Sequence, residues 1–278
     1  MMTPQQDYAI RVLVKAGESD DGALDIGETA LALAALEPAE GSLTSYREFL
    51  DNAAHAVAKH HPGDLDLTEQ VKLLQKVLGH ELGFMGDRNS YNDLANANLM
   101  RVIDRRKGLP VALGVVYLHI GRKLGLDMKG LSFPGHFLIR IEKNGERAIL
   151  DPFDGGAVRE TADLRGLLKS VQGPEAELTP EHYEVVSDRS VLLRLQNNIK
   201  MRKLQRGALE QAVETLQRMV LFAPNEPMLW RELGLFQARL GNILHAISAL
   251  ETFLKLGVPE SLKHQTALLL QKLKGSVQ

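Results

Sequence analysis

Residues 107–156 read KGLPVALGVVYLHIGRKLGLDMKGLSFPGHFLIRIEKNGERAILDPFDGG, and this stretch predicts a buried helix followed by a β-hairpin. Pro110 fits the first helical position, where the missing N–H of proline leaves no hydrogen bond unmade. Apolar residues cover most of the circumference of the following helix, which is typical of a buried helix, and Gly125 ends it. Asn144-Gly145 lies between two apolar runs and is the strongest short signal for a two-residue hairpin turn.

The hairpin turn also predicts which side chains meet. If residues 144 and 145 form the turn, residues at equal distances from it are paired, and Leu138 faces Asp151. Paired residues lie on one face of a sheet, as do residues two apart, so His136 lies diagonally from Asp151 at about 7–8 Å between their backbones. We therefore expect a hydrogen bond between these two side chains. It is either a structural bond or part of a catalytic site, because a carboxylate beside an imidazole selects its tautomer and stabilises its charged form.

The composition is that of a soluble globular protein with room for two domains. The chain has 278 residues, of which 44% are hydrophobic and 24% charged, and its net charge is −2. This balance provides no electrostatic argument for nucleic acid or an anionic membrane. There is neither a run of 18 apolar residues nor a basic segment followed by an apolar one at the N-terminus. We expect a cytoplasmic protein with no nucleic-acid or membrane partner.

The sequence contains no cysteine. This excludes disulfides, thiolate metal sites and a cysteine nucleophile. The histidines lack the His-x-x-x-His spacing with a third ligand that a metal site requires. We therefore expect neither a metal nor a cofactor.

An internal repeat occupies the helical segment 190–274. Residues recur at an offset of 34, the period of tetratricopeptide (TPR) helix pairs: Gly207 and Gly241, Ala212 and Ala246, Leu216 and Leu250. Residues 262–274 then form a capping helix. We predict two domains, one over residues 1–188 and one over residues 189–278. Repeats of this kind usually bind protein partners, although two units and a cap can also serve to brace the first domain.

The central stretch resembles the transglutaminase-like superfamily, whose members carry a Cys-His-Asp triad. The cysteine lies at the start of the buried helix, the histidine on one strand and the aspartate on the next. Aligning Arg122 and Gly125 with the family's Arg-x-x-Gly segment places Pro110 at the cysteine position within two residues. His136 and Asp151 match the other two members of the triad. Asp151 is also followed by the proline that is common after the last strand of this family.

The chain as a whole is similar to the SirB-type bacterial proteins, which join a transglutaminase-like domain to C-terminal TPR repeats. The resemblance covers roughly residues 30–278, and its most specific pieces are residues 84–96, 105–110, 133–138 and 150–156. It implies an α+β fold that is mostly helical. Helices would precede a transglutaminase-like (papain-like) core with a small antiparallel sheet, and an all-α repeat segment would follow.

The nucleophile of this family is missing. Transglutaminase and protease chemistry requires a thiolate, activated by the helix N-terminus and by the histidine. Between Met100 and Gly130 the chain has no Cys, Ser or Thr, and the only hydroxyl there belongs to Tyr117. We therefore expect a pseudoenzyme, a binding or regulatory protein in which His136 and Asp151 are the remnant of the triad. Its degenerate cleft, near Pro110 and Gly135, would take a peptide or a small molecule.

A non-covalent hydrolase is the alternative. The His136–Asp151 pair would then act as a general base on water, which supplies only about 10²–10⁴-fold. An oxyanion site would also be needed. Asn92, Asn96 or the backbone donors near Val111 are candidates for it, and the two asparagines are equally candidates for ligand binding.

Overall fold

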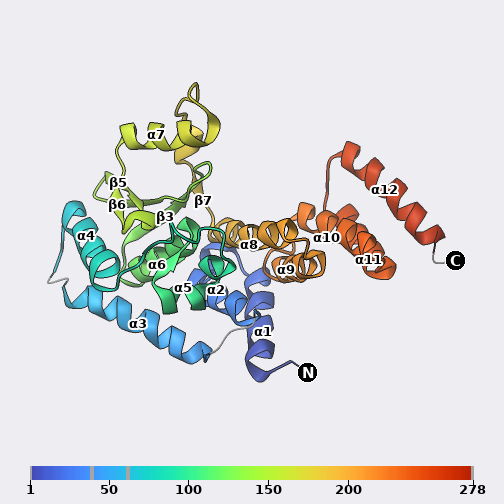
Figure 1. Ribbon diagram of the computed structural model, residues 1–278, viewed down its shortest axis with the longest axis horizontal. Coiled ribbons are helices and arrows are strands. Elements are labelled where there is room, and N and C mark those ends of the chain that lie inside the picture. Colours follow the sequence, from blue (N-terminus) through green and yellow to red (C-terminus); the bar gives the residue numbers. More distant parts are fainter. Residues whose placement is uncertain (1, 38–40, 61–62, 277–278) are drawn as a thin grey trace. The chain divides into compact units, whose positions relative to one another are not determined.

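The computed structural model describes residues 2–37, 41–60 and 63–276, which form a mostly helical chain with a small antiparallel sheet, as predicted (Figure 1). The chain divides into two compact units. The first comprises Met1–Val12 and Asp20–Leu195, and the second comprises Leu13–Ser19 and Gln196–Gln278. Helix α1 (Pro4–Glu18) and helix α8 (Asp188–Gln205) each contribute residues to both units. The division between residues 188 and 189 stays a prediction.

Helices form most of the first unit before the sheet. Each of these helices buries an apolar face. They are α2 (Ile26–Ala35), α3 (Leu43–Lys59), α4 (Leu67–Leu74) and α5 (Leu99–Arg105). Short polar side chains begin them: Asp25 accepts from the backbone N–H of Glu28, and Asp66 forms a capping box with Glu69. No helix within the described ranges is both long and apolar enough to cross a membrane.

The helix predicted from residue 67 onward changes its hydrogen-bond pattern partway along. Helix α4 continues as a π-helix over Gln75–Glu81. Within it, Gly79 lies so close to the loop after the hairpin that a Cβ at this position would be 2.5 Å from the carbonyl oxygen of Gly155. Gln75 also donates to the carbonyl of Gly156 at 2.9 Å. The π-helix, a feature found often at functional sites, therefore supports the loop that follows Asp151.

Helix α6 (Pro110–Lys123) is the buried helix of the core. Pro110 is its first residue, as predicted, and every residue from there to Leu118 is buried. The helix contacts α2, α3 and strand β3. Gly125, with φ +77°, ends it in the left-handed conformation that glycine adopts readily.

The sheet is antiparallel with strand order β6-β5-β4-β3-β7. Its strands are β3 (Asp127–Leu131), β4 (Ile139–Lys143), β5 (Glu146–Asp151), β6 (Ala157–Val158) and β7 (Val185–Val186). The hairpin has the predicted register, from Lys143 opposite Glu146 to Ile139 opposite Leu150. Asn144 and Gly145 have φ of +51° and +85°, as a type I′ turn requires. A second small sheet pairs β1 (Met85–Gly86) with β2 (Lys107–Gly108) in parallel.

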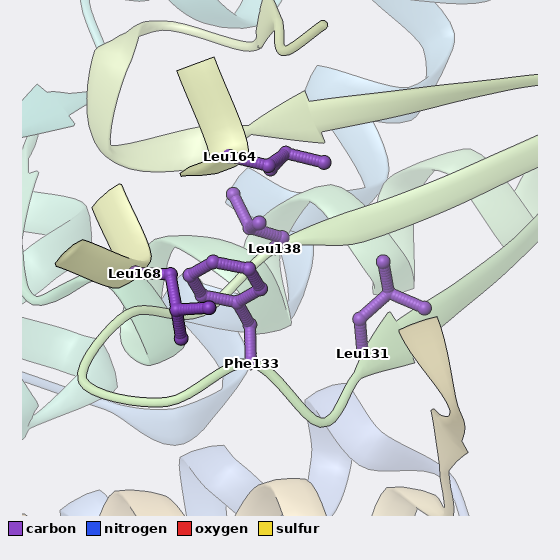
Figure 2. Close-up of a cluster of buried hydrophobic side chains, with 5 residues drawn as sticks. All are labelled: Leu131, Phe133, Leu138, Leu164 and Leu168. Carbon is purple, nitrogen blue, oxygen red and sulfur yellow. The ribbon is translucent and has the colours of Figure 1, made fainter. Parts of the chain in front are cut away.

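Helices cover both faces of the main sheet. On one face the ring of Phe137 packs against Gly114 of α6. On the other face lies α7 (Thr161–Gln172), and Figure 2 shows the apolar cluster that joins it to the sheet: Leu131, Phe133, Leu138, Leu164 and Leu168. Residues 137 and 138 thus point to opposite faces, as neighbouring residues of an extended chain do.

The repeat segment folds as predicted into two helix pairs and a last helix. After α8 come α9 (Leu209–Phe222), α10 (Pro227–Arg239), α11 (Ile243–Lys255) and α12 (Glu260–Gly275). Gly207 and Gly241, 34 residues apart, occupy matching turns with φ of +72° and +77°. Ala246 and Leu250 pack with Leu273, so α12 covers the apolar face of the second pair.

Gly114 provides a test of the packing between α6 and the sheet. Alanine normally stabilises the interior of a helix relative to glycine by about 0.5–1 kcal/mol. At Gly114, however, the new Cβ would lie 2.2 Å from the ring of Phe137. We expect Gly114→Ala to destabilise the protein by about 1–3 kcal/mol in urea unfolding, as overpacked core substitutions do. Gly166→Ala on α7, where nothing lies within 4 Å, is the control and should be neutral or stabilising. Equal effects of the two changes would contradict this packing.

Candidate functional site

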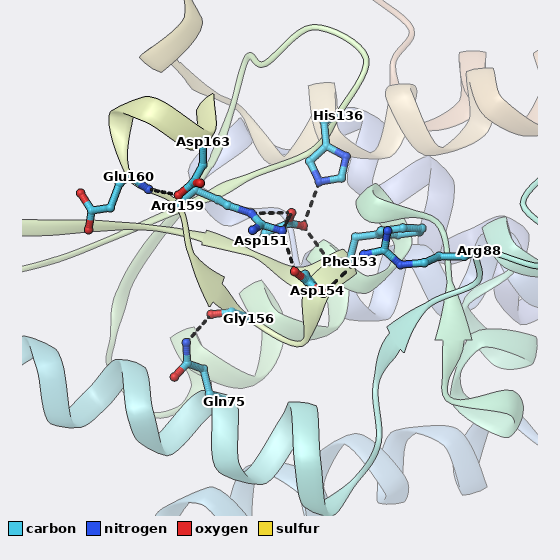
Figure 3. Close-up of polar contacts among 10 residues, drawn as sticks. All are labelled: Gln75, Arg88, His136, Asp151, Phe153, Asp154, Gly156, Arg159, Glu160 and Asp163. Carbon is cyan, nitrogen blue, oxygen red and sulfur yellow. Dashed lines mark hydrogen bonds and ion pairs between the residues drawn. The ribbon is translucent and has the colours of Figure 1, made fainter. Parts of the chain in front are cut away.

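The hairpin brings His136 and Asp151 together. His136 lies in the loop between β3 and β4, and Asp151 is the last residue of β5. The Nε2 atom of His136 is 2.8 Å from Oδ1 of Asp151, so the predicted hydrogen bond is present (Figure 3). Because an ionised carboxylate can only accept, we assign the proton to Nε2, which leaves Nδ1 of the neutral ring as the acceptor nitrogen.

Asp151 is bonded on every side. Its side chain is 2% exposed, and it accepts from the backbone N–H of Phe153 at 3.0 Å. Arg159 forms a two-pronged ion pair with Oδ2, at 3.0 Å from Nε and 2.8 Å from Nη2. Burial alone would raise the pKa of Asp151, but the bonds and charges of His136 and Arg159 outweigh it and hold that pKa below its ordinary value. Asp151 is therefore a fixed negative charge.

Arg159 is a site residue that the sequence analysis missed. The feature of the sequence that points to it is the Gly155-Gly156 turn, whose residues have φ of +62° and +82°. This turn folds the chain back, so that β6 pairs with β5 and Ala157 lies opposite Asp151. The guanidinium of Arg159 then reaches both Asp151 and Asp154, the latter at 2.8 Å. As a result Asp151 binds a permanent cation, Arg159, in addition to the ring of His136.

The helix end that carries the family's nucleophile has no group for covalent chemistry. Pro110 is buried at the first position of α6, and the backbone N–H groups that follow it belong to the first turn, which has no intrahelical partners for them. The only hydroxyl on α6 belongs to Tyr117, which is fully buried. Burial and the nearby charge of Asp151 raise the pKa of Tyr117 well above its ordinary value. A neutral, enclosed phenol is a poor nucleophile.

The two candidate asparagines lie in different environments. Asn96 is fully buried; its Nδ2 donates to the carbonyl of Ser90 at 2.6 Å, and its Oδ1 accepts from Arg105 at 3.1 Å. Arg105 in turn binds the buried carboxylate of Asp87 at 2.8 Å. The carboxamide of Asn96 is thus used to hold the loop before α5. Asn92 is exposed on that same loop.

Aromatic and basic side chains border the pair. The ring of Phe153 lies edge-to-face against His136 with 5.9 Å between centroids, and Tyr91 lies against Phe153 at 6.0 Å. Arg88 lies over the Phe153 ring at 5.3 Å and is 3.4 Å from Asp154 (Figure 3). Tyr91 is 41% exposed, and Arg88 is exposed as well. A ligand that approaches His136 would therefore meet an aromatic ring and a guanidinium.

Gly135 has a conformational role beside His136. Its φ is +66°, and a Cβ there would lie 2.6 Å from the side chain of Val171 on α7. Glycine thus satisfies both the turn and the close approach of the helix.

Among the residues that the structure describes, no three His, Asp or Glu side chains are grouped as metal ligands would be.

Two family profiles match the chain in order. Residues 44–197 match the profile described as "Transglutaminase-like superfamily", and residues 199–269 match a tetratricopeptide repeat profile. The first of these covers more than half of the chain and includes His136 and Asp151. It ends within α8.

Proteins named UPF0162 are similar to about two thirds of the chain. A UPF0162 protein of Vibrio cholerae is 35% identical over 176 residues, which is 63% of this chain and 65% of that protein. The UPF0162 protein PM0557 of Pasteurella multocida is 30% identical over 66% of this chain and 69% of its own length. Protein SirB1 of Salmonella typhimurium is 29% identical over 63% and 65%. The matched segment thus spans about two thirds of these relatives.

Among solved structures, the crystal structure of menin matches with a TM-score of 0.40 and 9% identity, over 90% of this chain and 70% of that one. Its title describes the menin site that binds the Mixed Lineage Leukemia protein. At this level of similarity the match supports no argument about the present chain.

Tyr117→Phe tests the environment beneath Asp151. The Tyr117 hydroxyl is buried and has no hydrogen-bond partner among the described residues. Removing such a hydroxyl removes an uncompensated desolvation cost of about 1–3 kcal/mol. We expect Tyr117→Phe to leave the free energy of unfolding unchanged or raise it by about 1 kcal/mol, measured by urea unfolding. A loss of more than about 1 kcal/mol would show that the hydroxyl makes a bond in solution.

Asp151→Asn tests the fixed charge through the pH dependence of stability. A carboxyl whose folded pKa is depressed contributes stability above its unfolded pKa of about 3.9, and this contribution is lost as the pH falls through the folded value. We expect Asp151→Asn to cost about 3 kcal/mol at pH 7 and progressively less below pH 4, by urea unfolding at each pH. Asp154→Asn, a more exposed partner of Arg159, is the control and should cost at most about 1 kcal/mol. A cost of Asp151→Asn that is constant with pH would contradict the assignment.

Proposed function

We propose that this chain, which belongs to the transglutaminase-like superfamily and ends in tetratricopeptide repeats, works as a non-catalytic binding or regulatory protein. The observation that carries the proposal is the start of α6. Pro110 stands there, the chain has no cysteine, and the one hydroxyl of the helix is enclosed beneath Asp151. The thiol chemistry of the family needs a thiolate at that helix end, so the nucleophile for the covalent step is missing.

The remaining pair supports a binding role for the surface around His136. His136 is held by a carboxylate whose charge is already balanced by Arg159. It therefore offers a ligand one oriented acceptor, Nδ1, with the ring of Tyr91 and the guanidinium of Arg88 beyond Phe153. A peptide or a small molecule with polar and aromatic groups fits such a border.

The repeats supply the second part of the proposal, a protein partner. Exposed methionines lie on the first helix of each pair, Met201 on α8 and Met228 on α10. Leu244 is exposed too, but on the second helix of the second pair, so it lies outside this set of first-helix methionines. Exposed, flexible methionines are common on surfaces that bind proteins. The location in the cytoplasm stays a prediction.

A non-covalent hydrolase is the second candidate, and the 2.8 Å bond between His136 and Asp151 is the observation in its favour. A general base alone supplies about 10²–10⁴-fold, so a donor for the oxyanion would be needed too. The carboxamide of Asn96 already bonds Ser90 and Arg105. Asn92 and the first-turn N–H groups of α6 near Val111 are the other candidate donors for this role.

His136→Gln separates binding from catalysis. We expect the purified protein and this variant to hydrolyse ester, amide and thioester model substrates at the same background rate. The expected change in rate is less than about twofold, because no nucleophile is activated by His136. Melting temperatures of both proteins serve as the control for folding. A hydrolytic rate that His136→Gln abolishes at an unchanged melting temperature would overturn the non-catalytic proposal.

Capture from bacterial lysate, read by mass spectrometry, tests the partner. The baits are the wild type, His136→Gln, a Met201→Glu/Met228→Glu variant and, as a matched surface control, Leu244→Glu. A protein lost only with the double variant would support a partner on the first helices of the repeats. A ligand lost only with His136→Gln would support use of the cleft. Identical captures for all four baits would contradict both binding roles.

A further inference from the structure

The loop that carries His136 has a stabilising contact from outside the sheet. The backbone between β3 and β4 closes through a bond from the N–H of Leu131 to the carbonyl of Leu138 at 3.0 Å, and the N–H of Ser132 donates to the carbonyl of Glu184 at 2.8 Å. The carbonyls of Phe133 and His136 both accept from a side chain instead: Nη2 of Arg194 is 3.0 Å from the first and 2.6 Å from the second. A single guanidinium nitrogen thus joins two carbonyls that are three residues apart.

Arg194 is placed to hold this geometry rigidly. It lies on α8, in the part of that helix that belongs to the first unit, and its guanidinium is 5.8 Å from the centroid of the Phe137 ring. Burial of the guanidinium lowers the pKa of Arg194 from its ordinary value, so its charge is kept at a desolvation cost. Arginine remains charged at such a cost, and the two N–H groups of its terminal nitrogen lie in the plane of the guanidinium, where they bind two acceptors in one fixed arrangement.

The opposite side of the loop is held by packing. Phe133 is part of the cluster on α7, and Gly135 lies against Val171 at the end of that helix. The loop is therefore enclosed between α7, which supplies apolar contacts, and α8, which supplies hydrogen bonds. The backbone conformation of His136 sets the direction of its side chain. The carbonyl of that same residue accepts from Arg194.

We propose that Arg194 is a positioning residue for His136, and that α8, the helix that opens the repeat segment, is therefore part of the site. Arg194 fixes the backbone of residues 133–136 and thereby keeps Nε2 of the imidazole on Asp151. The inference does not depend on the proposed function, because it concerns where the imidazole lies and not what the imidazole does. It also means that a chain cut between residues 188 and 189 would lack a component of the site.

The test uses full-length, ¹⁵N-labelled protein and the two variants Arg194→Met and Arg194→Lys. Long-range ¹H–¹⁵N spectra of the histidine rings report the tautomer and hydrogen bonding of each imidazole, and His136→Gln assigns the signals of His136. We expect Arg194→Met to shift the signals of both ring nitrogens of His136 toward their positions in Asp151→Asn. Arg194→Lys, which keeps the charge but not the fork, should fall between the wild type and Arg194→Met.

Arg122→Met is the matched control. Arg122 also donates to a backbone carbonyl, that of Met128 at 2.9 Å, and also ties α8 to the core, through Asp188 at 2.5 Å. It should lower the melting temperature and leave the His136 signals in place. If Arg194→Met folds and its His136 signals match the wild type, or if Arg122→Met moves them equally, the proposal is wrong. Should Arg194→Met not fold, unchanged His136 signals in Arg194→Lys overturn it in the same way.

Discussion

The carboxylate of Asp151 is the group on which the arrangement of the site depends, because four separate pieces of backbone converge on it. Asp151 itself lies on the hairpin, and the loop before β4 places His136 against it. The turn after β5 places Arg159 against it, and the backbone N–H of Phe153 donates the remaining hydrogen bond. A buried carboxylate is costly unless each oxygen is satisfied, so these pieces are held in one arrangement. The π-helical segment behind the turn, through Gly79 and Gln75, supports the same arrangement.

On the proposed function, His136 and Asp151 are two members of a triad whose third member is absent. In a cysteine enzyme the aspartate would act through the histidine on a thiolate. Here Asp151 is bonded as firmly to Arg159 as to His136, and the first position of α6 is Pro110. Both features are consistent with a site in which the imidazole is an oriented polar group beside Phe153, whose ring in turn contacts Tyr91 and Arg88.

Support for the site extends beyond the segment that contains its recognisable residues. The transglutaminase-like match ends at residue 197, inside α8, and so includes Arg194, which donates to the carbonyl of His136. Helix α8 thus carries side chains for two purposes. Its first half contacts the His136 loop, and its second half packs with α9, where Lys203 reaches Thr215 at 3.1 Å.

The sequence by itself determined the features that depend on local pattern. These features are the buried helix, the turn at Asn144-Gly145, the register that places His136 diagonally from Asp151, the 34-residue repeat and the missing nucleophile. Only the tertiary structure decided which distant side chains complete the site. A reversal of the chain places Arg159 against Asp151. Arg194, 58 residues beyond His136, donates to the carbonyl of His136, and Arg105 donates to the carboxamide of Asn96. Long arginine side chains reach their partners through packing that periodicity does not encode, so no local pattern predicts these contacts.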